Sequence, residues 1–275
     1  MKNYYIAFDS LIKERNDVLK HMVEHQTEIV NHVKTAKCYE LYSSSADDLG
    51  ILTPSLIRDK ITSGYHKGRR LKQKPLKKGY VSYEFDNTMR PLRIRKYNKE
   101  GHLDVTFYFI DYNDALFAIP CGGNNPLYIY PTDLHKIEYR EGQIWRYSTI
   151  TSNSLWQEVY DFAKNDYVEC KNCYYVSNLV GSDKSVLEEQ NSSPLQTWLA
   201  KIYMIENKVS RLLYYNFSNN KEELIYEYGK NIPITPITRE EMVRNQYSYS
   251  TVWFPIDLEN KIIEKLATNK CINRP

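Results

Sequence analysis

The residues best suited to chemistry lie in one N-terminal segment, His21-Met-Val-Glu-His25. Two histidines four positions apart share one face of an α-helix, and a glutamate beside them could serve as a general base at a bound metal. His32 extends the same face. One hypothesis is therefore a metal-dependent hydrolase that uses His21, Glu24 and His25. The sequence favours a plainer interpretation, polar residues bordering the apolar stripe of a surface helix, because no third ligand follows in a helical context.

The five cysteines offer a second set of candidate metal ligands. Cys170-Lys-Asn-Cys173 has the spacing of half a zinc knuckle, but no second cysteine pair accompanies it. The pair also does not open a helix in a βαβ unit, which is where a redox-active pair is expected. The total is odd and the positions are scattered, so a disulfide framework is not indicated. We therefore expect buried or incidental thiols in a reduced state, with no metal and no other cofactor.

A basic segment is the strongest candidate for contact with another molecule. Residues 54–100 contain 14 Lys and Arg against 4 Asp and Glu, a net charge of +10, whereas the rest of the chain contains 23 against 30, a net charge of −7. Such cations could contact phosphates while neighbouring tyrosines stack on bases. The competing interpretation is a solvated loop. The candidate binding residues are Tyr65, Arg69, Arg70, Lys74, Lys77, Lys78, Tyr80 and Tyr83.

The remaining polar clusters fit turns better than catalytic sites. Asp111-Tyr-Asn-Asp114 pairs two carboxylates, but Asp and Asn are typical turn residues. Gly122 and Gly123 precede two asparagines and no helix that could bind a phosphate. No Walker loop, nucleophile elbow or dinucleotide-binding motif is present. The sequence therefore favours a protein that is not an enzyme.

The location of the protein is indicated by its apolar segments. The N-terminal apolar stretch ends at Asp9, which is too early for a signal peptide. No run approaches the roughly 18 consecutive apolar residues of a membrane helix. We expect a cytoplasmic protein with no membrane partner.

Apolar periodicity predicts several helices. From Leu11 to Val33 the apolar residues recur at helical spacing, which predicts a helix over residues 10–36. Thr53 and Pro54 suit the start of a short helix that ends near residue 62. Ser154-Leu-Trp-Gln157 resembles a capping box and predicts a helix over residues 154–164, with Leu155, Val159 and Phe162 facing inward. Further helices are predicted over residues 182–190, from residue 238, and over residues 256–267.

Alternating apolar and polar residues between turn signals predict an antiparallel meander from Tyr80 onward. The predicted strands cover residues 80–85, 92–97, 102–110, 115–119, 127–130, 136–139, 143–147, 167–179, 197–205, 209–217 and 224–228.

Tyrosine dominates this part of the sequence. The chain has 25 Tyr against 8 Phe and 4 Trp, and tyrosine suits a pleated, half-buried surface. Three segments, 95–108, 137–147 and 213–228, share an order of strand, Tyr with polar turn residues, and a strand that ends in Tyr. Tyr97-Asn-Lys-Glu-Gly-His-Leu103 resembles a unit of the tyrosine-aspartate repeats of Rhs-type bacterial proteins and of β-rich immunity proteins against polymorphic toxins. The second copy lacks the Asn and the third lacks the Gly.

Together these observations predict an α+β fold with an N-terminal helix packed on a large, mainly antiparallel meander sheet and a short C-terminal helix. A helical part over residues 1–64, a basic loop or linker over residues 65–79 and a β-rich domain over residues 80–275 would divide the chain. The resemblance and the tyrosine-rich surface imply a protein-binding module, an immunity or antitoxin protein whose partner is another protein, such as a toxin. The alternatives are nucleic-acid binding through residues 64–80 and the metal-dependent hydrolase.

Overall fold

The structure of the 275-residue chain is a computed structural model. It describes residues 8–44, 50–57, 60, 69–75, 79–123, 129, 134–150, 154–164, 166–176, 196–216 and 221–230. The described helices are α1 (Phe8–Glu24) and α2 (Gln26–Ala36). The strands are β1 (Tyr39–Ser43), β2 (Arg70–Leu71), β3 (Tyr80–Phe85), β4 (Pro91–Tyr97), β5 (Leu103–Tyr112), β6 (Ala115–Gly122), β7 (Leu134–Arg140), β8 (Gln143–Ile150), β9 (Ser154–Asp161), β10 (Val168–Val176), β11 (Gln196–Ile205), β12 (Lys208–Asn216) and β13 (Lys221–Glu227).

All described strands belong to one antiparallel sheet with the order β13-β12-β11-β10-β9-β8-β7-β6-β5-β4-β3-β1-β2. From β3 to β13 each strand pairs with its neighbours in sequence, so the prediction of a mainly antiparallel meander is confirmed. Short hairpin loops join many of these strands. At Asn113-Asp114 and at Glu206-Asn207 both loop residues have positive φ, the conformation that matches the right-handed twist of the flanking strands.

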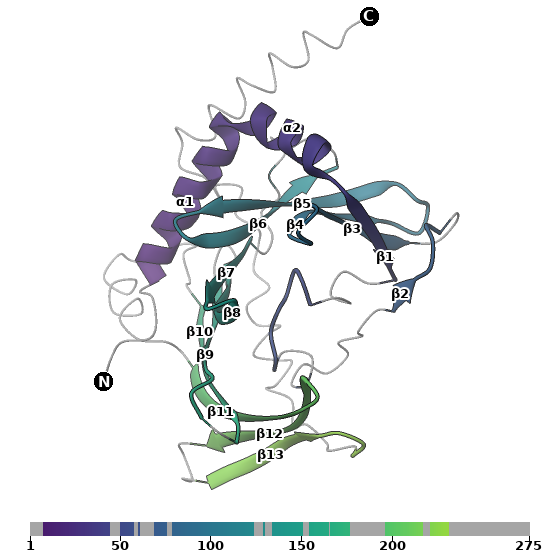
Figure 1. The fold of residues 1–275 in the computed structure, drawn as a ribbon. Coiled ribbons are helices and arrows are strands. Elements are labelled where there is room, and N and C mark those ends of the chain that lie inside the picture. The colour runs from purple at the N-terminus through teal and green to yellow at the C-terminus, as the bar shows by residue number, and fades with distance from the viewer. Residues whose placement is uncertain are drawn as a thin grey trace, which may run out of the picture.

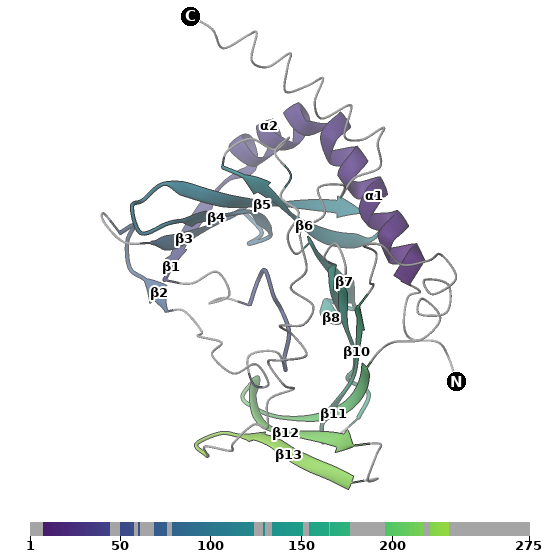
Figure 2. The same cartoon turned by 180° about the vertical axis from the view of Figure 1, so that it is seen from behind.

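The sheet curls so that β3–β6, β7–β10 and β11–β13 follow one another around a concave side (Figures 1 and 2). A segment without regular secondary structure, residues 50–57, lies within this curve in both views, and we call it the inner strap. Its apolar side chains join two clusters of sheet residues. Leu52 packs with Tyr83, Phe107 and Tyr147, and Ile57 belongs to the cluster of Tyr160, Ile202 and Leu212.

The opposite, outer face of the sheet carries the helices on its first half (Figure 1). Leu11, Leu19 and Met22 of α1 share a buried cluster with Phe117 and Ile119 of β6. An ion pair joins the same surfaces, since Nζ of Lys136 lies 2.6 Å from Oε2 of Glu14. Within the described residues, no helix combines the length and the apolar character needed to cross a bilayer.

A buried carboxylate fixes the inner strap to the sheet. Glu158 of β9 accepts hydrogen bonds from Oγ of Ser55 at 2.7 Å, from Nε1 of Trp156 at 2.6 Å and from the hydroxyl of Tyr160. The Tyr160 oxygen in turn accepts the backbone N–H of Leu56 at 3.0 Å. Burial raises the pKa of the Tyr160 hydroxyl, so it remains a donor to Glu158 at physiological pH. The strap is therefore held by polar contacts as well as by the packing of Leu52 and Ile57.

The structure corrects the helix predicted over residues 154–164, because residues 154–161 form β9. In a strand, successive side chains point to opposite faces. Trp156 and Tyr160 accordingly pack on the inner side, while Val159 lies on the outer face. Phe162, predicted to face inward, follows the strand and is 38 % exposed. The capping-box pattern is short, and Val, Trp and Tyr in this segment also favour strands.

Other predicted elements differ in their bounds. Residues 8–36 are helical, but the helix is interrupted at His25. The segment before residue 64, predicted to be helical, also contributes β1, which lies between β2 and β3. Thr53–Ile57 are not helical; Lys60 is, and the rest of the predicted 54–62 helix lies outside the described residues. The predicted helices at 182–190, from 238 and at 256–267 also lie outside them, as does most of the predicted strand at 127–130.

We predict that Tyr160→Phe destabilises the fold although it leaves no cavity. The change removes a donor to buried Glu158 and the acceptor of the Leu56 N–H, and a buried polar group that loses its partner costs about 1–3 kcal/mol. Urea unfolding monitored by circular dichroism would measure the loss. Tyr228→Phe is the matched control, because Tyr228 is 78 % exposed. Equal unfolding free energies for the two variants would contradict the role given to the Tyr160 hydroxyl.

Thiol labelling provides a second test of the core. Cys121 lies in the outer cluster and Cys170 in the inner cluster of Ile57, whereas Cys38 is exposed. Burial raises the pKa of the Cys121 thiol, so the reactive thiolate is disfavoured there. In the native protein at pH 8, iodoacetamide should therefore modify Cys38 and leave Cys121 and Cys170 unmodified until urea is added. Peptide mass spectrometry reads out each site, and rapid native labelling of Cys121 would be inconsistent with the fold.

Candidate functional site

The predicted basic site is only partly present as a surface. Arg69, Arg70 and Lys74 are exposed at and beside the edge strand β2, whereas Tyr65, Lys77 and Lys78 lie outside the described residues. Tyr80 is buried and stacks on Tyr97, with ring centroids 4.3 Å apart. Tyr83 is 1 % exposed and packs in an inner cluster. The prediction that Tyr83 offers a stacking face is therefore wrong, because both faces of β3 are covered.

Several cations of the basic segment are neutralised within the protein. Glu84 is buried, and its carboxylate lies 2.7 Å from a guanidinium nitrogen of Arg93 and 2.5 Å from one of Arg95. Lys37 also contacts Glu84, at 3.2 Å. Arg90 pairs with Asp111. The positive charge counted along the sequence is thus larger than the charge available to a partner on this surface.

The histidine motif forms a small cluster on the helices. The ring centroids of His21 and His25 are 4.6 Å apart, and Nδ1 of His25 lies 3.0 Å from Oε2 of Glu28. Partial burial, followed by the neighbouring His25, lowers the pKa of His21, so neutral imidazole is favoured there. A search of the described part of the chain finds no group of three or more residues arranged to hold a metal ion. The cysteine motif lies on β10 with Cys170 buried, and the side chain of Cys173 is outside the described part.

Among the described residues, one surface site arises from a β-bulge in β8. The pairing of β7 with β8 shifts between Glu138↔Arg146 and Tyr139↔Ile144, which leaves Trp145 as the extra residue. Ile144 and Tyr147 are three positions apart, so a regular strand would direct them to opposite faces, yet both pack in the same inner cluster. The bulge places both Trp145 and Arg146 on the other face, a known effect of bulges on side-chain direction.

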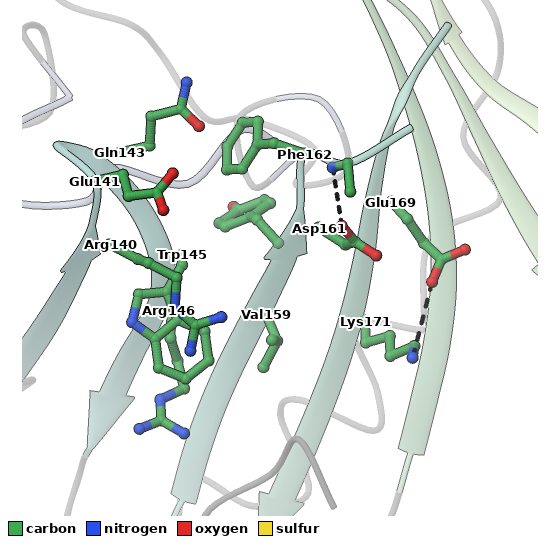
Figure 3. A pocket seen from close by; sticks show the side chains of 12 residues that line it. Arg140, Glu141, Gln143, Trp145, Arg146, Val159, Asp161, Phe162, Glu169 and Lys171 are labelled. Carbon is green, nitrogen blue, oxygen red and sulfur yellow. Dashed lines mark hydrogen bonds and ion pairs between the residues drawn. The ribbon is translucent and has the colours of Figure 1, made fainter. Parts of the chain in front are cut away.

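Trp145 and Arg146 line one wall of a surface recess of about 730 Å³, which we call the Trp145 recess (Figure 3). The recess spans the ends of β7–β10. Its lining residues are Arg140, Glu141, Gln143, Trp145, Arg146, Val159, Tyr160, Asp161, Phe162, Ala163, Glu169 and Lys171. The small side chain of Val159 lies between the larger ones on either side, as Figure 3 shows. The volume is sufficient for several side chains of a partner.

The wall at β7 and β8 combines an aromatic ring with two cations. The guanidinium carbons of Arg140 and Arg146 lie 4.2 and 4.3 Å from the centroid of the Trp145 ring, within the range of cation–π attraction. Glu138 binds Arg146 through both carboxylate oxygens, one of them at 2.5 Å from Nη2. Arg140 is exposed, and within the described ranges no hydrogen bond or ion pair holds its guanidinium. The Trp145 ring is thus fixed by Arg146, which Glu138 anchors, while the guanidinium of Arg140 beside it can bind a partner.

The wall at β9 and β10 is acidic. Asp161 pairs with Glu169 in the strand register, so both carboxylates project from the same face. Asp161 accepts the backbone N–H of Ala163 at 2.9 Å and is exposed. Glu169 lies 3.8 Å from Nζ of Lys171, a loose ion pair. The partly exposed ring of Phe162 lies near Tyr160, with their ring centroids 6.1 Å apart. The recess therefore presents a cationic aromatic side and an acidic side.

Sequence reasoning missed this site for two reasons. The segment Arg140-Glu-Gly142 was interpretable only as a turn, and a bulge leaves no mark in the apolar pattern when Trp, Arg and Tyr follow each other. The helix predicted over residues 154–164 also directed Val159 inward, away from Trp145. The available signal was Trp145, which lies between Arg140 of the turn and Arg146 of the strand. Trp and Arg are enriched where proteins bind one another.

Comparison with protein-family models finds no match for this chain, and searches among characterised proteins and solved structures find none either.

Proposed function

We propose that this chain is a non-enzymatic protein-binding module of the bacterial immunity or antitoxin type, acting in the cytoplasm on a protein partner. The N-terminal helices and the curled sheet would form its scaffold. The observation that supports the proposal best is the Trp145 recess, where an indole ring and two guanidinium groups line a cavity on the outer face.

The composition of the recess suits a binding anchor. Trp, Tyr and Arg contribute most of the energy at the centres of protein interfaces. Binding to a side chain that is already ordered loses less conformational entropy than binding to one that becomes ordered in the complex. Trp145 is held by the bulge and by Arg146, which Glu138 fixes in turn, so the anchor is formed before binding.

A second candidate function, nucleic-acid binding, is favoured by one observation. Arg69, Arg70 and Lys74 are exposed close together in sequence at the edge of the sheet, and Lys74 lies 5.9 Å from the Tyr80 ring. The tyrosine rings beside them are buried or stacked on each other, which leaves charge rather than base stacking as the means of contact.

The protein-binding proposal predicts that Trp145→Ala weakens partner binding. The partner would be captured from the native host with the immobilised full-length chain, identified by mass spectrometry, expressed and purified, and its affinity measured by calorimetry. Loss of a central tryptophan typically costs about 2 kcal/mol or more, so we expect a Kd at least roughly 30-fold higher.

Tyr228→Ala is the matched control. It removes an aromatic side chain that is 78 % exposed, directly after the end of β13 and outside the lining of the recess. The control should bind within about twofold of the wild type. An unchanged affinity of Trp145→Ala for the purified partner, with the wild-type fold retained, would refute the recess as the binding site.

The nucleic-acid candidate predicts retention on an immobilised single-stranded oligonucleotide at low salt. The triple variant Arg69→Ala, Arg70→Ala, Lys74→Ala should lose that retention, because the three cations would contact phosphates. Lys13→Ala, Lys20→Ala, Lys34→Ala removes the same charge from exposed helix positions and should be retained like the wild type. Wild-type protein that flows through at low salt would eliminate this function.

A further inference from the structure

Arg140 and Asp161, two charges of opposite sign, face the Trp145 recess from its two walls. Among the residues that the structure describes, Arg140 has no ion-pair partner, and Asp161 has only the backbone N–H of Ala163 as a donor. Of the other charged residues at the recess, Arg146 is engaged by Glu138 and Glu169 by Lys171, while Glu141 is exposed in the turn next to Arg140. A partner that covers the recess removes water from both Arg140 and Asp161.

The loss of water around Arg140 and Asp161 determines which charges a partner must carry. An ion that is buried without a counter-charge costs several kcal/mol, so a stable complex must supply an anion to Arg140 and a cation to Asp161. The planar guanidinium of Arg140 matches a carboxylate, with which it can form two parallel hydrogen bonds. Asp161 is an exposed carboxylate, which suits a lysine or arginine of the partner.

The strand spacing sets the separation of the two groups. Arg140 ends β7 and Asp161 ends β9, with one strand between them, which corresponds to about 10 Å between their backbones. In an extended peptide, residues two apart point to the same side and lie about 7 Å apart. A glutamate and a lysine at such positions can span the recess, because both side chains are long.

We infer that the Trp145 recess binds an extended segment of a partner protein that carries an acidic and a basic side chain two residues apart, the acid on Arg140 and the base at Asp161. This inference rests on the proposed protein-binding function and specifies the chemistry of the partner. An exclusively acidic or exclusively basic segment would leave one wall of the recess uncompensated.

The test uses the pentapeptide acetyl-Ala-Glu-Ala-Lys-Ala-amide as a probe. The indole N–H signal of Trp145, assigned by its absence from the ¹⁵N spectrum of Trp145→Phe, should shift on titration and give a Kd. The all-acidic peptide with Glu at both charged positions and the all-basic peptide with Lys at both should each bind at least about tenfold more weakly, the ratio expected for one lost charge pair of about 1.4 kcal/mol.

Charge reversal distinguishes recognition from a structural effect. Arg140→Glu and Asp161→Lys should each weaken binding of the mixed peptide by about tenfold or more, since each places like charges together. The double variant should regain binding, because it exchanges the two walls and the peptide can bind in the opposite direction. Melting temperatures of all variants should match the wild type, as both positions are exposed.

Equal binding of the three peptides, or a double variant that binds no better than the single ones, would overturn the inference. The same variants measured against the purified partner separate its failure from that of the proposed function. Weak binding by Trp145→Ala together with normal binding by Arg140→Glu and Asp161→Lys would refute the charge pattern alone. Normal binding by all three would refute the recess as the protein-binding site.

Discussion

The hydrogen-bonded carboxylate of Glu158 is the contact that fixes the inner strap in the concave side of the curled sheet. A curled sheet has a concave face that must be filled, and here a segment from outside the β3–β13 meander contributes to filling it. The inner strap supplies Leu52 to one cluster and Ile57 to the other, but it has no strand partner to fix its position. Ser55, Tyr160 and the Leu56 N–H fix it through Glu158. An apolar residue at position 158 would fill the space without setting the register of the strap.

Glu158 lies in the strand that also forms the floor of the Trp145 recess. Glu158 and Val159 are neighbours in β9, so the strand that directs Glu158 toward the strap directs Val159 outward to the floor of the recess. The bulge in β8 interrupts this strict alternation at one place only within the β7–β8 pairing, and it places Trp145 and Arg146 together on the outer face. The recess therefore requires both a regular β9 and an irregular β8.

The sequence allowed most of the sheet to be predicted because hairpins depend on local information. β3 was predicted with its observed bounds, and the turns at Asn98 and at Glu206 follow from polar residues between alternating segments. The helix predicted over residues 154–164 was wrong because it rested on a local capping-box pattern of four residues. The pairing of this segment with β8 and β10 is a tertiary interaction that the sequence does not display. The net charge counted for residues 54–100 overstates the available cations for a related reason. Arg93 and Arg95 are counted as free cations in the sequence, but the fold brings Glu84 between them.

Among the residues that the structure describes, the buried tyrosines serve as scaffold, and the hydroxyl groups of Tyr147 and Tyr160 show how. A buried tyrosine hydroxyl usually has a hydrogen-bond partner, so a buried ring can also fix a polar neighbour. The Tyr147 hydroxyl lies 2.8 Å from Nδ1 of His135 and 2.8 Å from Oγ1 of Thr149, and Tyr160 is bound to Glu158. A ring tied into such a network cannot turn to meet a partner. Trp145 differs because its ring is held by two guanidinium groups, and one of them, that of Arg140, is available to a partner. The proposed binding surface is therefore centred on a residue type used four times in the chain and not on the one used 25 times.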